Sequence, residues 1–212
     1  MTVAILEDVY NAIIEGKVED AAAGVEQGLN AGIAVDDLLK KGLLSAMDLV
    51  GERFGEGEIF IPHVIWSAKA MQAGMDLLRP HFSESQQKKS ARIIIGTAQG
   101  DIHDIGKNLV GMMLEGAGFE VVDLGVDIKP EQFVEKAVEE KADIIAVSAL
   151  LTTTMLSMAK VVSLKNEKYL SSLKVIIGGA PLSMDFCKEI GADSYGVDAM
   201  DAVAKVKELM GL

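Results

Sequence analysis

Residues 92–106, Arg-Ile-Ile-Ile-Gly-Thr-Ala-Gln-Gly-Asp-Ile-His-Asp-Ile-Gly, join a short apolar run to a polar loop that contains glycine. The run Arg92–Gly96 is rich in isoleucine and short, which favours a strand buried on both faces. A helical pattern follows at 105–117. The stretch therefore predicts a strand, a polar loop and a helix, the order that is typical of one unit of a parallel α/β sheet.

The same alternation continues toward the end of the chain. Further strands are expected at 119–122, 143–147, 174–177 and near Ser194, and further helices at 130–140, from Thr152, before Ser194 and from Asp198. Strands that alternate with helices form a parallel sheet with helices on both faces. We therefore expect a Rossmann-like, doubly wound α/β domain with five parallel strands over residues 92–212. Ligands of such sheets bind at the carboxyl ends of the strands, here after residues 96, 147 and 177.

Residues 1–80 show only helical patterning. Apolar residues recur every three or four positions, which predicts four helices near 5–13, 18–30, 39–54 and 62–78. Four such helices are enough to close a bundle. Residues 81–91 are mostly polar and aperiodic, as in a linker. The expected fold class is thus α/β, with a helical domain at 1–80, a linker at 81–91 and the sheet domain at 92–212.

The composition excludes several classes of function. A net charge of −12 without a Lys/Arg cluster argues against a nucleic-acid partner. Cys187 is the single cysteine, so no internal disulfide can form, and the three histidines lack zinc-site spacing. The chain starts without a basic region, and no apolar run approaches the roughly 20 residues that span a bilayer. We expect a cytoplasmic protein with no membrane partner.

The loop after the first strand does not fit a nucleotide-phosphate site. A P-loop has four residues between its glycines and then Lys-Ser/Thr. Here Gly100 and Gly106 enclose five residues, and Lys107 precedes Asn108. The Rossmann spacing G-x-G-x-x-G is absent as well, so both kinds of phosphate loop fit poorly.

Two metal-based interpretations of this loop are open. A divalent-metal hydrolase could use Asp101, His103 and Asp104, although no further histidine or obvious carboxylate follows the next strands. Alternatively, His103 is the single protein ligand of a cofactor that brings its own equatorial donors. Asp101 could then accept the other ring N–H and fix the tautomer, and Gly106 would allow close approach of a bulky ligand.

The second interpretation is supported by a resemblance. Three pieces of sequence fall at successive ligand-edge positions: Asp101-x-His103-x-x-Gly106, Ser148-x-Leu150 and Gly178-Gly179. Together they resemble the signature of the cobalamin-binding fold of methionine synthase, the corrinoid methyltransferase proteins and the cobalamin mutases. The resemblance implies that cobalamin binds base-off, with its dimethylbenzimidazole tail inserted beside the sheet and His103 as the lower axial ligand of cobalt.

The same resemblance implies roles for further residues. Asp101, His103 and Thr154 would form the axial ligand and its proton relay, although the family often has serine at the last position. The implied cofactor-binding residues of the sheet domain are Asp101, His103, Asp104, Ile105, Gly106, Ser148, Leu150, Thr152, Thr154, Gly178, Gly179 and Tyr195. The diglycine would leave room for the nucleotide tail, and Ser148 would offer a hydroxyl to its buried nitrogen.

The helical half carries a resemblance too. Residues 51–71 are similar to the helical cap that covers the upper corrin face in methionine synthase and the corrinoid methyl carriers. In that family the cap shields the methyl group. The resemblance therefore implies that Phe60, Val64 and Trp66 contact the upper face.

The implied function is that of a corrinoid methyl carrier, which is no enzyme on its own and holds methylcobalamin, cob(I)alamin or cob(II)alamin. Its expected partners are a substrate:corrinoid methyltransferase, a methylcorrinoid:acceptor methyltransferase and a reductive activase for cob(II)alamin. Methylamines, methanol, glycine betaine and aryl methyl ethers are all open as donors, and tetrahydrofolate and coenzyme M as acceptors.

Two alternatives share the motif. A cobalamin-dependent regulator would need a DNA-binding module, which we expect neither before residue 1 nor after residue 212. An adenosylcobalamin mutase subunit normally works with a barrel partner and lacks this cap.

Overall fold

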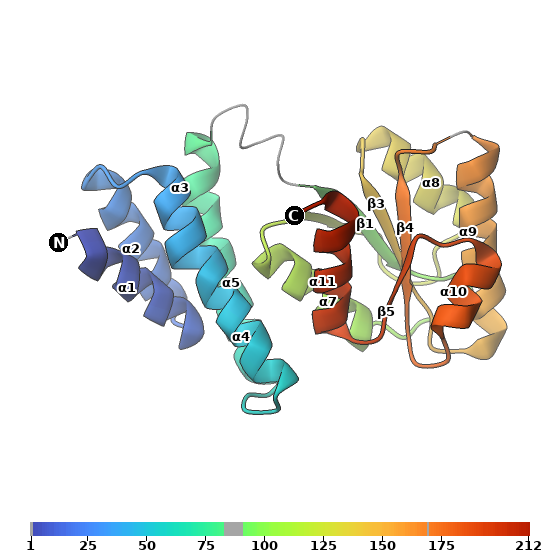
Figure 1. Ribbon diagram of the computed structural model, residues 1–212, viewed down its shortest axis with the longest axis horizontal. Helices are drawn as coiled ribbons and strands as arrows, with labels where there is room; N and C mark the ends of the chain where they lie inside the picture. Colours follow the sequence, from blue (N-terminus) through green and yellow to red (C-terminus); the bar gives the residue numbers. More distant parts are fainter. Residues whose placement is uncertain (1, 83–90, 169) are drawn as a thin grey trace. The chain divides into compact units, whose positions relative to one another are not determined.

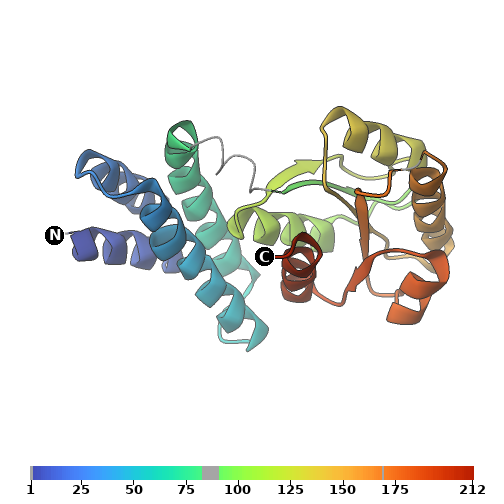
Figure 2. The same ribbon diagram turned by 45° about the horizontal axis from the view of Figure 1, so that its top comes forward.

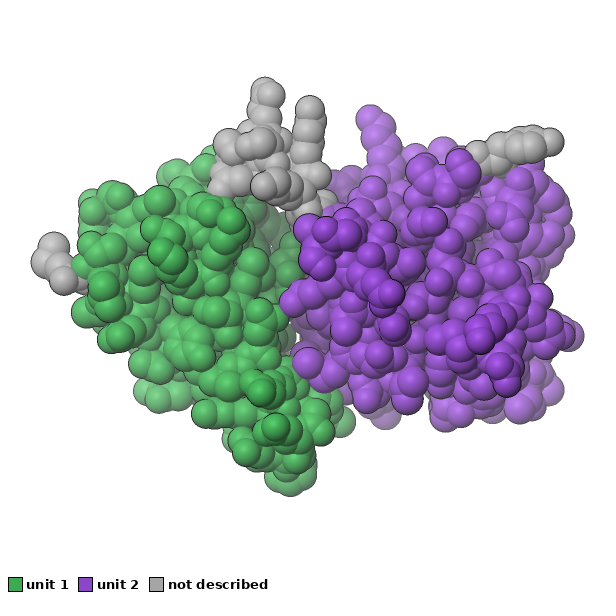
Figure 3. Space-filling model, viewed as in Figure 1, with its two compact units in different colours: residues 1–90, 115–118 green, residues 91–114, 119–212 purple. Residues whose placement is uncertain are grey.

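The computed structural model describes residues 2–82, 91–168 and 170–212. It divides into two compact units (Figure 3), a helical unit of residues 1–90 with 115–118 and a sheet unit of residues 91–114 with 119–212. Most of the predicted linker, residues 83–90, lies outside the described part of the chain. Each unit is therefore described by itself.

The helical unit has the four predicted helices. Its elements are α1 (Thr2–Ile14), α2 (Val18–Asn30), α3 (Val35–Asp37), the π-helical η1 (Leu38–Leu44), α4 (Ser45–Gly55), α5 (Ile61–Leu78) and the short η2 (Arg79–His81). α3, η1 and α4 follow one another without a gap, so they correspond to the single predicted third helix. The π-helical turns were not predicted, because the apolar spacing of three and four residues does not distinguish them from an α-helix.

The sheet unit contains five parallel strands, which confirms the predicted fold class. The strands are β1 (Arg92–Thr97), β2 (Glu120–Asp123), β3 (Ile144–Ser148), β4 (Lys174–Gly178) and β5 (Ser194–Gly196). Their order in the sheet is β2-β1-β3-β4-β5. The chain thus leaves β1 toward one edge and then returns to its other side, which places the reversal of strand order between β1 and β3.

Helices cover both faces of this sheet (Figures 1 and 2). They are α7 (Ile105–Gly116), α8 (Pro130–Glu139), the 3₁₀ turn η3 (Thr152–Thr154), α9 (Met155–Glu167), α10 (Met184–Ile190) and α11 (Ala199–Met210). α8, α9 and α10 pack around one apolar core that includes Phe133, Met158 and Cys187. α7 and α11 lie on the opposite face of the sheet (Figure 1). Within the described ranges, no helix has the length and apolarity that crossing a membrane would require.

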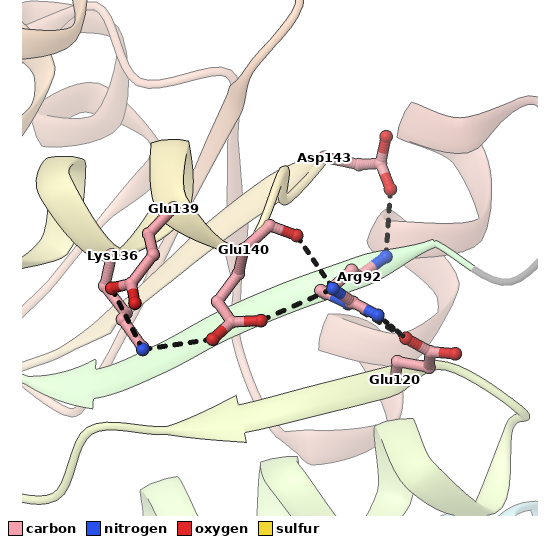
Figure 4. A network of polar contacts seen from close by, with 6 residues as sticks. All are labelled: Arg92, Glu120, Lys136, Glu139, Glu140 and Asp143. Atoms are coloured by element: carbon pink, nitrogen blue, oxygen red, sulfur yellow. Dashed lines mark hydrogen bonds and ion pairs between the residues drawn. The ribbon is translucent and has the colours of Figure 1, made fainter.

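A network of charged side chains ties the first two strands and α8 together (Figure 4). Arg92 donates to Glu120 through Nε at 2.9 Å and Nη2 at 2.6 Å, and its Nη1 donates to the carbonyl oxygen of Glu140 at 2.9 Å. The amide of Arg92 donates to the Asp143 carboxylate at 2.9 Å. Because Arg92 begins β1, this network lies at the end of the sheet opposite to the ligand edge and leaves that edge free.

Removal of the Arg92 fork, the pair of hydrogen bonds from its Nε and Nη2 to Glu120, should destabilise the sheet unit modestly. We expect Arg92→Met to lower the free energy of unfolding by about 1 kcal/mol, since a two-pronged surface pair is worth more than a single one but is screened by solvent. The matched control is Lys205→Met, which removes only an exposed pair with Glu208. Urea unfolding measures both variants, and equal midpoints for the two would contradict a role for the fork.

Candidate functional site

The site is built around the carboxylate of Asp101, in the loop between β1 and α7. This side chain is fully buried, and five donors surround it. Oδ1 accepts from the amide and from Nδ1 of His103, at 3.0 and 2.7 Å. Oδ2 accepts from the amides of Leu150 and Leu151, at 2.7 and 3.2 Å, and from the hydroxyl of Thr154 at 3.1 Å. Asp101 therefore joins the loops that follow β1 and β3.

These hydrogen bonds keep the Asp101 carboxylate ionised. Burial by itself raises the pKa of Asp101, but the backbone and side-chain donors that point at both oxygens lower the pKa well below its ordinary value. An ionised carboxylate can only accept hydrogen bonds, so Nδ1 of His103 must be the donor in their contact. The neutral imidazole then carries its lone pair on Nε2.

His103 presents this lone pair to the outside. Its side chain is about half exposed, at 49%, whereas its partner Asp101 is at 0%. The backbone of His103 is held as well, because the buried hydroxyl of Thr97 donates to its carbonyl oxygen at 3.1 Å. The ring is thus anchored on one nitrogen and available on the other, which is the arrangement of a metal-binding histidine with a carboxylate behind it.

Thr154 has a hydroxyl with two acceptors. Its Oγ1 lies 3.1 Å from Asp101 Oδ2 and 2.8 Å from the carbonyl oxygen of Leu151. A hydroxyl has a single hydrogen, so it can donate to only one of them at a time. Asp101 contacts both His103 and Thr154, so the three residues of the predicted relay lie together with Asp101 in the middle.

An apolar cavity of about 340 Å³ opens beside this loop, within the sheet unit. It lies between the sheet and the two helices α7 and α11. Near the ligand edge its lining includes Gly106, Ser148, Gly178 and Gly179; farther along α7 and α11 it is lined by aliphatic side chains such as Leu114 and Val206. An elongated, largely aliphatic cavity suits a flat organic group more than an ion.

The lining fits the nucleotide tail that the sequence predicts here. A Cβ on Gly106 would meet nothing within 4 Å, whereas one on Gly179 would lie 1.9 Å from the carbonyl oxygen of Ala149. Missing side chains thus serve two purposes: open space at Gly106 and close backbone packing at Gly179. Ser148 also lines the cavity, and its Oγ makes no hydrogen bond to another described residue, so it is available to a ligand.

Most of the other predicted residues lie at the ligand edge. Asp104 Oδ2 accepts from the side chain of Asn108 at 3.1 Å, which fixes the first turn of α7. Ile105, Leu150 and Thr152 are exposed there. Leu150 therefore contributes to the network through its amide and leaves its side chain free.

Tyr195 and Val64 are two further predicted residues, and their side chains pack against apolar cores. Tyr195 donates from its hydroxyl to the carbonyl oxygen of Leu182 at 3.1 Å and packs against the core on the α8–α10 face. Because side chains alternate along a strand, its neighbour Gly196 lines the cavity instead. Val64 is fully buried in the apolar stripe of α5, whereas Phe60 and Trp66 of the helical unit are 68% and 54% exposed, and contact of these three residues with the upper corrin face stays a prediction.

The sequence analysis missed several residues that support the site. Thr97 and Asp127 hold the loop of His103 by hydrogen bonds to its backbone. Lys107 is buried beside the cavity and donates to Asp123 and Asn108. The sequence offered one signal, the Gly-Val-Asp turn that ends at Asp127, because aspartate is enriched among residues with positive φ.

The divalent-metal hydrolase finds no support in the residues that the structure describes. Among them, no three His, Cys, Asp or Glu side chains gather as ligands for an ion.

Fold and site together define a binding protein for a metal-containing organic cofactor: one histidine faces outward at the switch point of a parallel sheet, beside an aliphatic cavity. The sequence matches the B12 binding domain family over residues 91–204, and a second B12 binding domain family over residues 5–79. The chain belongs to the corrinoid proteins with B12 binding domains, and its cofactor is cobalamin.

Several relatives cover nearly the whole chain. It is 45% identical to trimethylamine corrinoid protein 2 of Methanosarcina mazei, over 96% of this chain and 94% of that one. It is 40% identical to a corrinoid protein of Desulfitobacterium hafniense, over the full length of both. A chain of the methanol:cobalamin methyltransferase complex of Methanosarcina barkeri superposes with a TM-score of 0.87, at 30% identity, over 98% of this chain and 80% of that one.

Proposed function

We propose that the protein is the methyl-carrying corrinoid subunit of a methyltransferase system, in which His103 is the lower axial ligand of cobalt in base-off cobalamin. One observation carries the proposal: Nδ1 of His103 donates a hydrogen bond to a buried, ionised carboxylate, so the lone pair of Nε2 is oriented to bind a metal. The cavity beside it supports the base-off mode, since it offers room for the displaced tail.

The relatives favour a methylamine as the methyl donor. Similar proteins are named for trimethylamine and dimethylamine in Methanosarcina mazei and Methanosarcina acetivorans. A structural relative belongs to a complex that acts on methanol, at the lower identity of 30%. We therefore propose a methylamine first and methanol as the second candidate. The acceptor of the methyl group, coenzyme M or tetrahydrofolate, belongs to a separate partner enzyme.

Bound cobalamin supplies a cobalt centre that can accept and give up a methyl group. The residues of this chain then control the nitrogen below it. While His103 binds the metal, Asp101 holds the hydrogen on Nδ1 and strengthens Nε2 as a donor. When Nε2 is released, it can take up a proton, and the ionised Asp101 stabilises the resulting imidazolium. The hydroxyl of Thr154 stabilises the negative charge of Asp101 when it donates to that carboxylate, and it withdraws this hydrogen bond when it donates to the carbonyl oxygen of Leu151.

This division of work implies partners. The hydrogen bonds of Asp101 join His103 and Thr154 in an arrangement that suits a metal ligand with a proton relay. We therefore propose that a substrate:corrinoid methyltransferase loads the cofactor, that a second methyltransferase unloads it, and that a reductive activase restores it after oxidation. The same proposal places residues 1–80 as the cap, residues 81–91 as the linker and residues 92–212 as the cobalamin-binding domain.

Methyl loading tests the proposal. The cobalamin-loaded chain, with its cobalt reduced to Co(I) by titanium(III) citrate, is incubated with radiolabelled trimethylamine, with and without a purified trimethylamine methyltransferase, and label on the bound cofactor is measured. We expect label only when the methyltransferase is present, because this chain orients cobalamin but does not activate the amine. Label without the enzyme would overturn the carrier role. No label with enzymes for trimethylamine, dimethylamine, monomethylamine and methanol would overturn the methyltransferase assignment.

A further inference from the structure

The loop after β2 runs beside the loop that carries His103. The amide of Thr97 donates to the carbonyl oxygen of Gly125, and the amide of Ile128 donates to the carbonyl oxygen of Thr97, both at 3.0 Å. Ala98 and Ile128 form an isolated parallel bridge beyond the ends of the strands. The β1–β2 pairing therefore continues into the functional loop instead of ending at the edge of the sheet.

Asp127, in the loop after β2, forms two hydrogen bonds to the loop after β1. Its Oδ1 accepts from the amide of Gly100 at 2.7 Å, and its own amide donates to the carbonyl oxygen of Asp101 at 3.0 Å. The two hydrogen bonds thus hold the amide of Gly100 and the carbonyl group of Asp101, on either side of the peptide group that joins these residues. Gly100 has a φ of +85°. Because glycine can adopt many backbone conformations, a hydrogen bond from outside the loop restricts the backbone strongly at this position.

The backbone of Asp127 is itself strained. Its φ is +56°, and in the described part of the chain only Lys141, with a φ of +53°, shares this conformation among residues other than glycine. Lys141 follows α8 and donates its amide to the carbonyl oxygen of Val138 at 3.2 Å, far along the chain from the site. Such strain persists where surrounding contacts enforce it, and functional sites are a common location.

We propose that Asp127 is a positioning residue for the axial histidine, although it lies outside the Asp-x-His-x-x-Gly motif. It acts through Asp101: by fixing the amide of Gly100 and the carbonyl group of Asp101, it fixes the backbone of the residue whose carboxylate orients the ring of His103. The inference rests on the proposed role of His103 as the cobalt ligand. Without the hydrogen bonds of Asp127, the loop that carries His103 samples other conformations, and the population in which Nε2 faces the metal falls.

Three substitutions separate the carboxylate from the backbone conformation. Asp127→Asn keeps the side-chain acceptor and a residue that tolerates positive φ; Asp127→Gly keeps the conformation but removes the acceptor; Asp127→Ala removes both. Lys141→Gly is the matched control, because it relieves the same backbone strain at a remote position. Thermal unfolding of all four variants verifies that the sheet unit is folded.

The first readout is the electron paramagnetic resonance spectrum of the Co(II) cofactor in full-length protein that carries ¹⁵N-labelled histidine, in which a two-line nitrogen splitting reports axial ligation by histidine and a three-line splitting reports ligation by the cofactor's own base. We expect the ratio of His-on to His-off protein to fall about tenfold in Asp127→Ala and Asp127→Gly, as loss of one hydrogen bond to a charged group predicts. Asp127→Asn should stay within about threefold of the parent protein. An unchanged ratio in Asp127→Gly would overturn the role of the carboxylate.

The second readout does not depend on the cofactor. Amide hydrogen exchange of residues 100–103 in cobalamin-free protein should be at least about tenfold faster in the alanine and glycine variants and unchanged in the asparagine variant and in Lys141→Gly. If exchange rises as expected but no spectrum shows axial nitrogen even in the parent protein, the proposed ligand is wrong while Asp127 still positions the loop. Equal exchange in all variants would overturn the positioning role.

Discussion

Replacing His103 with alanine is expected to abolish axial nitrogen ligation of the bound cobalt and to weaken cobalamin binding at least about tenfold. The fold should survive, because the ring is half exposed and Asp101 keeps donors from Leu150, Leu151 and Thr154. The absorbance spectrum and a cobalamin titration measure the two effects, and the circular dichroism spectrum should stay that of the parent protein.

The chain offers a matched control for this experiment. His81 is an exposed histidine of η2, in the helical unit, so His81→Ala removes the same type of side chain outside the candidate site. Its spectrum and affinity should equal those of the parent protein. If His103→Ala also keeps the parent spectrum, another group ligates the metal and the axial assignment fails.

The second large effect is expected from Gly179→Ala. The new Cβ would lie 1.9 Å from the carbonyl oxygen and 2.9 Å from the carbonyl carbon of Ala149, and the φ of +133° at this position is unfavourable for alanine. The atoms that it would meet all belong to the backbone of Ala149, which cannot move aside like a flexible side chain. We expect a loss of more than about 3 kcal/mol in the free energy of unfolding of the sheet unit.

Thermal unfolding should show this loss as a decrease in Tm of about 6 °C or more. The control is Gly32→Ala, where φ is also positive, at +74°, but the added Cβ meets nothing within 4 Å. It should cost only about 1 kcal/mol, the price of the backbone conformation alone. Equal decreases in the two variants would show that the close approach at Gly179 has no energetic consequence.

The fold could be predicted from the sequence because each strand was an uninterrupted apolar run between helical patterns. Arg92–Gly96 and the later runs agree closely with β1 to β5, and glycines separated the helices of the first half. The strand order could not be predicted, since parallel strands with short connections permit several orders. The π-helical turns of Leu38–Leu44 were invisible to a search for helical spacing.

The candidate site was predictable where its residues follow one another closely in sequence. The contacts that join Asp101 to Leu150 and Thr154 depend on β1 and β3 being neighbours, and here a resemblance supplied what spacing could not. The direction of the Tyr195 side chain could not be predicted, because the face of a three-residue strand cannot be told from its sequence. Asp127 was missed because its two hydrogen bonds, one accepted by its carboxylate and one donated by its amide, are both made to backbone groups, which leave no motif.

The two acceptors of Thr154 have a kinetic consequence. The hydrogen of its hydroxyl can turn from the carbonyl oxygen of Leu151, at 2.8 Å, to Asp101, at 3.1 Å, by rotation about one C–O bond. No heavy atom has to move, and no water has to enter. Such rotations are many orders of magnitude faster than the roughly 1–1000 turnovers per second of ordinary enzymes. The turn of the Thr154 hydroxyl is therefore too fast to limit the rate of the methyl transfer that we propose for this protein.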